Sequence, residues 1–434
     1  MSDNKSGRDY DLVLIGATGY TGALTAEHIA EHLPTNLRWA IAGRSSAKLN
    51  RLAAKLKELG PDRIQPVIEI VDVEDKAQLI TIVKKARLCV SVVSYHHVGP
   101  LVIEACIEGV TDYIDTAGTI PRIRQWINDY HRAAELAGVV ILNSCGALSA
   151  PHDLLTWSSV RQLQQSSSFK TKELVLSLLE MPSDPSGGTV ESIMMRGGLD
   201  AKVQYESRQP WYLSPIVGRQ NLSSTNLFGV RHDPTLGIMS TSSLSDVQNR
   251  AVVHRTWGLL NGGMAYGANF HYSEYKKASS TLAAMFQMLN TVAVNLMLAL
   301  PPLRAIAAMV LPAPGQGPDP VKEKNYRFEM EAVAIADTDD DATAPRAYSH
   351  FAYPGGPIPC HRCFLGPRRS FFTLSQKIRG RRLWWLSHTG ILRARSDREN
   401  SRSEHRLQHQ NAVTSGSFKG YKTTCTDVGY SREN

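Results

Sequence analysis

The 434-residue chain has few cysteines and lacks several motifs that mark common enzyme classes. Its six cysteines are too few and too scattered for a disulfide framework, so we expect a reducing compartment. The opening residues MSDNKSGRDYD contain no basic segment followed by an apolar run, so we expect no secretory signal. No Walker-type loop, HExxH motif or Ser-His-Asp arrangement is visible. We therefore expect a cytoplasmic protein whose chemistry rests on other motifs.

The net charge of +8 comes from one end of the chain. Residues 359–434 hold 12 Arg and 3 Lys against 5 acidic residues, which gives +10 and leaves the remainder at −2. The hydrophobic fraction of 42% fits a globular body. Because that body is near neutral, the basic balance says nothing about its substrate.

Short apolar runs alternate with longer amphipathic stretches over residues 1–150, and this pattern predicts a Rossmann-type, doubly wound parallel sheet covered by helices. The expected strands are residues 11–15, 38–42, 65–71, 88–94, 112–115 and 139–142. After Pro151 this regular alternation ends, and we expect a second, α+β domain over 151–357.

Residues 278–303 form a run without a formal charge that ends at Pro301-Pro302. Its length is near that of a membrane-spanning helix, but Gln287, Asn290 and Asn295 interrupt it. Two interpretations stay open. One is a buried or amphipathic helix of the second domain, and the other is a helix that associates with a membrane or lipid surface.

The strongest motif is Gly16-Ala-Thr-Gly19-Tyr-Thr-Gly22, which follows the first expected strand and opens the first expected helix. Gly16 permits a tight turn, Gly19 leaves room for a pyrophosphate, and Gly22 lets the helix pack close to the sheet. The helix N-terminus offers N–H groups to the phosphates. The segment therefore predicts a dinucleotide site formed by Gly16, Ala17, Thr18, Gly19, Tyr20, Thr21 and Gly22.

The residues after the second strand favour NADP(H) over NAD(H). An NAD site usually has an acidic residue there, whereas this chain has Arg44 and Ser45. Arg44 can hold a 2′-phosphate through two charged hydrogen bonds, and a solvated Arg44 with either cofactor accepted is the alternative. Asp72 and Ser94, near the ends of the third and fourth strands, are further candidate cofactor contacts. Capping of the next helix is the alternative role of Asp72.

Hydride transfer requires a group that orients the substrate or protonates the developing anion. Tyr95, His96 and His97 follow the fourth strand, at the carboxyl edge of the sheet where such proteins bind ligands. Asp115 ends the fifth strand. These four are the candidate catalytic residues. The alternative is that they are loop residues that contact the cofactor ribose or nothing, with Asp115 as a helix cap.

Several segments together resemble saccharopine dehydrogenase-like oxidoreductases, and among them the trans-acting enoyl reductase subfamily. They are GATGYTG, AGRS, the segments 106–115 and 145–154, SGGTVES (186–192), the stretch 266–275 and residues 314–318. The resemblance runs from about Asp11 to Pro357. It implies an NADP(H)-dependent oxidoreductase that reduces a carbon–carbon double bond of a lipid-like or polyketide acyl chain, either as a small molecule or on a carrier.

Two departures from the family pattern motivate a second hypothesis. Ala147-Leu148-Ser149 replaces the usual Phe-Asp-Ser type of segment, and Thr119 stands where an acidic residue is common. With the uncharged segment 278–303, these departures fit a non-catalytic cofactor-binding protein at a membrane or lipid surface. That protein would be peripheral to an intracellular membrane or lipid droplet.

The resemblance ends where the Arg-rich tail, residues 358–434, begins. Relatives continue with apolar, helical sequence, so we expect either a disordered tail or one produced by a misassigned exon or frame change. Cys360 and Cys363 have the spacing of half a zinc site, but no second pair follows, so we expect no metal. The RGRRLWW segment belongs to no recognisable binding fold, so we expect no nucleic-acid partner.

Overall fold

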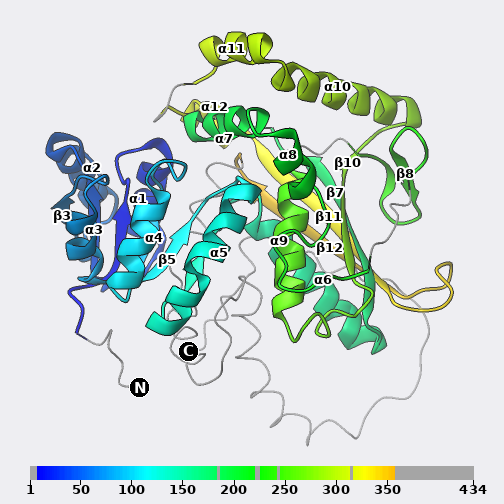
Figure 1. Cartoon of the computed structure of the whole chain (residues 1–434), viewed down its shortest axis with the longest axis horizontal. Coiled ribbons are helices and arrows are strands. Elements are labelled where there is room, and N and C mark those ends of the chain that lie inside the picture. Colours follow the sequence, from blue (N-terminus) through cyan, green and yellow to red (C-terminus); the bar gives the residue numbers. More distant parts are fainter. Residues whose placement is uncertain (1–6, 183–185, 220–224, 242–244, 313–315, 357–434) are drawn as a thin grey trace, which may run out of the picture.

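The computed structural model describes residues 7–182, 186–219, 225–241, 245–312 and 316–356, which form two sheet-and-helix units side by side (Figure 1). The Arg-rich tail expected from residue 358, including Cys360 and Cys363, lies outside the described residues, so the expectations about it stay predictions.

The first sheet consists of six parallel strands in the order β3-β2-β1-β4-β5-β6. Its strands are β1 (Tyr10–Ile15), β2 (Trp39–Gly43), β3 (Val67–Ile70), β4 (Ala86–Ser91), β5 (Asp112–Asp115) and β6 (Ile141–Leu142). The helices between them are α1 (Tyr20–His32), α2 (Ser46–Leu59), α3 (Lys76–Val83), α4 (Gly99–Glu108) and α5 (Ile120–Ala137). Leu12, Val13 and Leu14 are all fully buried because helices cover both faces of the sheet. The predicted Rossmann-type sheet is confirmed.

The second sheet is mixed, in the order β12-β11-β7-β10-β9-β8, with β7 and β10 parallel and the other neighbours antiparallel. Its strands are β7 (Thr171–Glu180), β8 (Val230–Asp233), β9 (Gly237–Ser240), β10 (His271–Lys277), β11 (Arg327–Ala336) and β12 (Arg346–Pro354). Helices α6 (Ala150–Ser167) and α9 (Asp246–Leu259) pack against it. This sheet confirms the expected second α+β unit.

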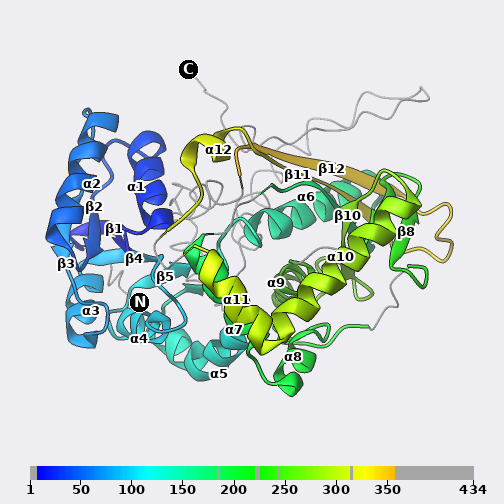
Figure 2. The ribbon, with the colours of Figure 1, turned by 90° about the horizontal axis from the view of Figure 1, so that it is seen from above.

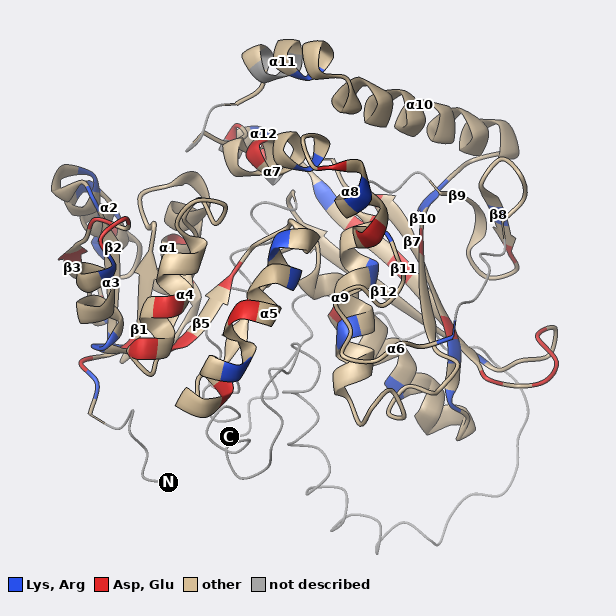
Figure 3. Cartoon of the chain, in the orientation of Figure 1, with Lys and Arg blue, Asp and Glu red and all other residues tan. Residues whose placement is uncertain are grey.

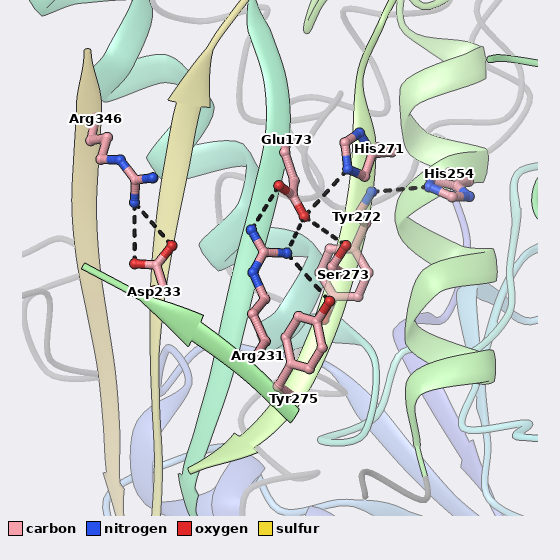
Figure 4. Close-up of polar contacts among 9 residues, drawn as sticks. All are labelled: Glu173, Arg231, Asp233, His254, His271, Tyr272, Ser273, Tyr275 and Arg346. Carbon is pink, nitrogen blue, oxygen red and sulfur yellow. Dashed lines mark hydrogen bonds and ion pairs between the residues drawn. The ribbon is translucent and has the colours of Figure 1, made fainter. Parts of the chain in front are cut away.

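A buried ionic cluster ties strands of the second sheet together (Figure 4). Arg231 on β8 donates hydrogen bonds to both carboxylate oxygens of Glu173 on β7, at 2.5 and 2.9 Å. Its Nη1 also lies 3.3 Å from the hydroxyl of Tyr275. Ser273 and His271 on β10 contact the same carboxylate, at 2.9 and 3.3 Å. Because β9 and β10 lie between β7 and β8 in the sheet order, the cluster fixes strands that do not pair directly.

A third group of helices lies above the two sheets (Figures 1 and 2). It comprises α7 (Gly187–Gly197), α8 (Ala201–Ser207), α10 (Thr281–Ala299), α11 (Pro301–Val310) and α12 (Pro320–Lys324). Helix α10 carries no charged residue, as Figure 3 shows, and Ala284 is its one buried residue. By length and composition α10 could cross a membrane. The interpretation of segment 278–303 as a buried helix is therefore wrong, because α10 packs on the outside of the fold and most of its surface is exposed; an amphipathic helix and a helix at a lipid surface stay open.

Candidate active site

The glycine motif forms the turn that the sequence predicts between β1 and α1. Gly16 has a φ of +85°, a left-handed conformation that favours glycine. A Cβ on Gly22 would lie 2.2 Å from the backbone oxygen of Gly16, so only glycine fits there. A Cβ on Gly19 would meet that same oxygen at an ordinary 3.4 Å. The fold therefore requires Gly16 and Gly22, whereas Gly19 keeps space open for a ligand.

A large cavity of about 1670 Å³ opens at the carboxyl edge of the first sheet. Single small-molecule pockets are roughly 300–1,000 Å³, so this cavity has room for a dinucleotide and a second ligand. Among the predicted site residues, those that line it are Gly16, Thr18, Gly19, Tyr20, Thr21, Arg44, Ser94, Tyr95 and His97. The predicted residues that do not line it are Ala17, Gly22, Ser45, Asp72, His96 and Asp115.

One end of the cavity is positively charged. Arg44 and Lys48 are both exposed and both line the wall after β2. Ser45 is instead the N-cap of α2, where its hydroxyl accepts a hydrogen bond from the Lys48 backbone N–H at 3.4 Å. The carboxylate of Asp72 accepts a hydrogen bond from the Glu74 N–H at 3.1 Å, as in a local turn. Two neighbouring cations after β2 suit a 2′-phosphate, so the residues present fit NADP(H).

The loop after β4 links the two units of the fold. Strand β4 ends at Ser91, earlier than the predicted residue 94, and the chain then turns toward α7. The Ser94 hydroxyl donates to Glu191 at 2.9 Å, and His97 Nε2 lies 3.3 Å from the same carboxylate. The Tyr95 hydroxyl lies 2.7 Å from the Ser192 hydroxyl. Three predicted residues therefore meet α7, an element of the second domain.

The Tyr95 hydroxyl is held by two neighbours at the junction between the two units. Besides Ser192, it contacts the Thr119 hydroxyl at 3.0 Å. Burial raises the pKa of Tyr95, although the hydrogen bonds of Ser192 and Thr119 partly oppose this shift. The phenol therefore keeps its proton at neutral pH and can act as a proton donor.

His96 packs behind Tyr95, with ring centroids 4.0 Å apart. Within the described residues, neither of its ring nitrogens has a hydrogen-bond partner. Burial lowers the pKa of His96 to about 4, so the ring is neutral at neutral pH. A neutral ring outside the cavity lining does not suit a general acid, and we assign His96 a packing role.

Asp115 is fully buried beneath the cavity floor. Its carboxylate accepts hydrogen bonds from the Ala117 N–H at 2.9 Å and the Ser144 N–H at 3.0 Å. It also accepts from the Asn143 amide at 2.7 Å and the Tyr113 hydroxyl at 3.0 Å. With these four donors around it, Asp115 fixes the loops after β5 and β6 and does not line the cavity.

The fold brings several residues into the cavity that the sequence motifs do not indicate. They are Lys48, Ser149, Glu191, Ser192, Arg196 and Gln248. Glu191 and Ser192 end the SGGTVES segment, which carried the family resemblance but was given no role in the site. Lys48 lies four residues after Arg44, across the start of α2, and that spacing could have indicated a second phosphate contact. Among the described residues, no group of three or more His, Cys, Asp or Glu side chains is placed to hold a metal.

Comparison with known proteins agrees with this geometry. Residues 12–142 match the family model described as saccharopine dehydrogenase NADP binding domain. The trans-acting enoyl reductases of Mycobacterium ulcerans and Mycobacterium tuberculosis are each 29% identical over 288 residues, which is 64% of this chain and 68% of the relative. Saccharopine dehydrogenase (L-Glu forming) from Saccharomyces cerevisiae has a TM-score of 0.46 at 13% identity, covering 85% of this chain and 91% of that chain. Residues 12–142 therefore form a saccharopine dehydrogenase NADP-binding domain, with NADP(H) as its cofactor, and the chain is similar to trans-acting enoyl reductases over 64% of its length.

Proposed function

We propose that this protein is an NADPH-dependent reductase of a carbon–carbon double bond conjugated to the carbonyl of an acyl chain. One observation carries the proposal: a single cavity joins the dinucleotide cradle to the apolar side of α10. The α10 side chains on its wall include Val292, Val294, Leu296 and Leu298. Such a wall suits the hydrocarbon part of a lipid-like or polyketide chain.

The reaction requires a hydride, a proton and a group that stabilises the negative charge of the enolate formed between the two transfers. When bound, NADPH supplies the hydride, which adds to the β-carbon while the double-bond electrons move toward the carbonyl oxygen. The resulting enolate takes a proton at its α-carbon. Tyr95 is the group we assign to this step, because its hydroxyl is protonated at neutral pH and lies on the cavity wall. Solvent then restores the phenol proton.

Similarity to trans-acting enoyl reductases supports the same reaction class. We propose a carrier-bound acyl chain as the preferred substrate form and a free thioester as the simpler one. An open cavity bordered by an exposed helix is compatible with a chain delivered from outside.

The proposal is tested with the purified full-length chain, NADPH and trans-2-enoyl thioesters of increasing length. We expect NADPH oxidation together with a saturated product gaining two hydrogens by mass spectrometry. Tyr95→Phe should lower kcat about 10²- to 10⁴-fold, the usual contribution of a general acid. Tyr205→Phe, an exposed tyrosine, is the matched control. NADPH binding without oxidation of any enoyl thioester, or full activity in Tyr95→Phe, overturns the proposal.

A second candidate function is cofactor binding without catalysis at a membrane or lipid-droplet surface. The observation that favours it is the exposed apolar surface of α10 and α11, which includes Leu282, Phe286, Leu289, Ile306 and Met309. Apolar side chains of this size on an exposed helix suit an interfacial helix. Flotation with liposomes, lost in Phe286→Glu/Leu289→Glu and unaccompanied by any enoyl reduction, would favour this candidate over the first.

A further inference from the structure

Arg196 is a cation in the cavity wall that has no counterion among the residues that the structure describes. It occupies the last turn of α7 and lines the cavity. Within the described part of the chain, its guanidinium forms no ion pair and donates no hydrogen bond. Burial lowers the pKa of Arg196, and the nearby Tyr95 opposes that shift. The side chain is therefore half-buried in the cavity wall and is not compensated by any described group.

Other shielded arginines of this chain do have partners. Arg231 is paired with Glu173 at 2.5 Å, and Arg255 donates to the Leu213 carbonyl at 2.7 Å. Arg304 donates to the Gly197 carbonyl, directly after Arg196. Removing a charge from water costs several kcal/mol unless a partner compensates. An uncompensated arginine in a cavity wall therefore indicates that a bound ligand supplies its partner.

The position of Arg196 along α7 places it beside the proposed proton donor. Ser192, one helical turn earlier on the same face, holds the Tyr95 hydroxyl at 2.7 Å. The one other charged α7 residue, Glu191, is already engaged by Ser94 at 2.9 Å and by His97 at 3.3 Å. Arg196 is thus the cation of this helix that remains available to a ligand next to Tyr95.

We infer that Arg196 binds the acyl carbonyl oxygen of the substrate and stabilises the negative charge that this oxygen gains as the hydride adds. The inference rests on the proposed function and extends it to the oxyanion site. A guanidinium donates two parallel hydrogen bonds to one or two oxygens. A contact that strengthens as charge develops accelerates the reaction, because it stabilises the transition state more than the ground state. The same geometry binds a carboxylate, which resembles the enolate in charge.

The first experiment uses decanoate, a saturated carboxylate that cannot be reduced. Its binding to the NADP⁺-loaded full-length protein is measured by calorimetry in the wild type, Arg196→Met, Arg196→Lys and the control Lys202→Met. Lys202 is an exposed cation on α8 that does not line the cavity. We expect Arg196→Met to weaken decanoate roughly 10- to 150-fold, the effect of losing a charged hydrogen-bonded pair. Arg196→Lys should recover part of the loss, and Lys202→Met should bind like the wild type.

The second measurement is thermal stability without ligand, which separates binding from a structural role. A cation near a helix C-terminus can stabilise the helix dipole, and its removal would then lower Tm. For a ligand-binding Arg196, Arg196→Met should keep or raise Tm, since an uncompensated charge is removed. A lower Tm with unchanged decanoate affinity overturns the inference.

The kinetic measurement distinguishes this inference from the proposed function. If the wild type reduces enoyl thioesters, Arg196→Met should lower kcat with a smaller change in KM, because the contact strengthens in the transition state. If the wild type reduces no enoyl thioester but decanoate binding still depends on Arg196, the anion site stands and the reaction class fails. Unchanged kcat and unchanged decanoate binding in Arg196→Met reject the anion site while leaving the reductase proposal intact.

Discussion

The Tyr95 hydroxyl lies 2.7 Å from the Ser192 hydroxyl, although 97 residues separate them in the chain. Ser192 in turn donates its proton to the Gly188 carbonyl at 2.8 Å. The Tyr95 hydroxyl therefore lies between the hydroxyls of Ser192 and Thr119, at the junction of the two units. This relationship gives the site its candidate acid and links its chemistry to the docking of α7.

Ser192→Ala should shift the alkaline limb of the pH profile. The hydrogen bond from Ser192 lowers the pKa of Tyr95, so removing it should raise that pKa further. A general acid works below its pKa, so the loss of kcat/KM at alkaline pH should begin at a higher pH in Ser192→Ala. The pH dependence of kcat/KM checks this, with Ser158→Ala, a serine on α6 that does not line the cavity, as the control. A shift toward lower pH would contradict the role of Tyr95 as the acid.

Arg44→Ala should weaken NADPH binding roughly 10- to 150-fold and leave NADH almost unchanged, because a bidentate charged contact to the 2′-phosphate is lost. Lys48→Ala should have a smaller effect of the same kind, since an ammonium acts as a point charge. Fluorescence titration with both cofactors measures this. Arg51→Ala, an exposed arginine on α2 outside the cavity, is the control. Equal losses for NADPH and NADH in Arg44→Ala would show that Arg44 does not read the 2′-phosphate.

Gly19→Val should lose NADPH binding, whereas Gly22→Ala should lose thermal stability. Valine at Gly19 has space in the protein but occupies the place of the pyrophosphate, so Tm should hold while NADPH binding is lost. Alanine at Gly22 meets the Gly16 carbonyl oxygen at 2.2 Å and should lower Tm. Calorimetric scans with and without NADPH measure both effects. Normal NADPH affinity in Gly19→Val would contradict the assignment of the glycine motif to the pyrophosphate site.

Arg231→Met should destabilise the protein by about 3–5 kcal/mol, because it leaves the Glu173 carboxylate buried without its main partner. The double variant Glu173→Met/Arg231→Met should recover much of this loss, since neither charge then remains. Urea unfolding of the single and double variants makes the comparison. If the double variant is as unstable as the sum of the two single ones, the two residues do not act as a pair.

Glu173 should also make stability depend on acid pH. Burial raises its pKa, but the hydrogen bonds and charges of Arg231 and His271 lower it more, so the folded value lies well below the ordinary one. An unfolded glutamate has a pKa of about 4.3. The unfolded state therefore binds more protons below that pH, and the contribution of Glu173 is full above it and lost as pH falls further. The stability difference between wild type and Glu173→Gln should shrink on acidification, and a constant difference would contradict this.

Local patterns in the sequence determine the first unit and its cofactor. The alternation of apolar runs and amphipathic helices predicts the parallel sheet, because each element buries a face set by its own period. Gly16, Gly19 and Gly22 predict the cradle, since the turn and the helix start depend on neighbouring backbone alone. Arg44 indicates NADP(H) because it immediately follows its strand.

Only the tertiary structure decides which residues meet in the cavity. Tyr95, His96 and His97 are adjacent in sequence, yet Tyr95 and His97 line the cavity while His96 packs behind them. Asp115 ends its strand like a site residue, but four donors enclose it, one on β5 itself and three in the loops after β5 and β6. Segment 278–303 looks as suitable for a core as for a surface, and its position across α7 leaves it exposed. Arg196 is an ordinary helical arginine in the sequence. It becomes a candidate anion site only because long-range packing places it in the cavity wall without a carboxylate partner from the described residues.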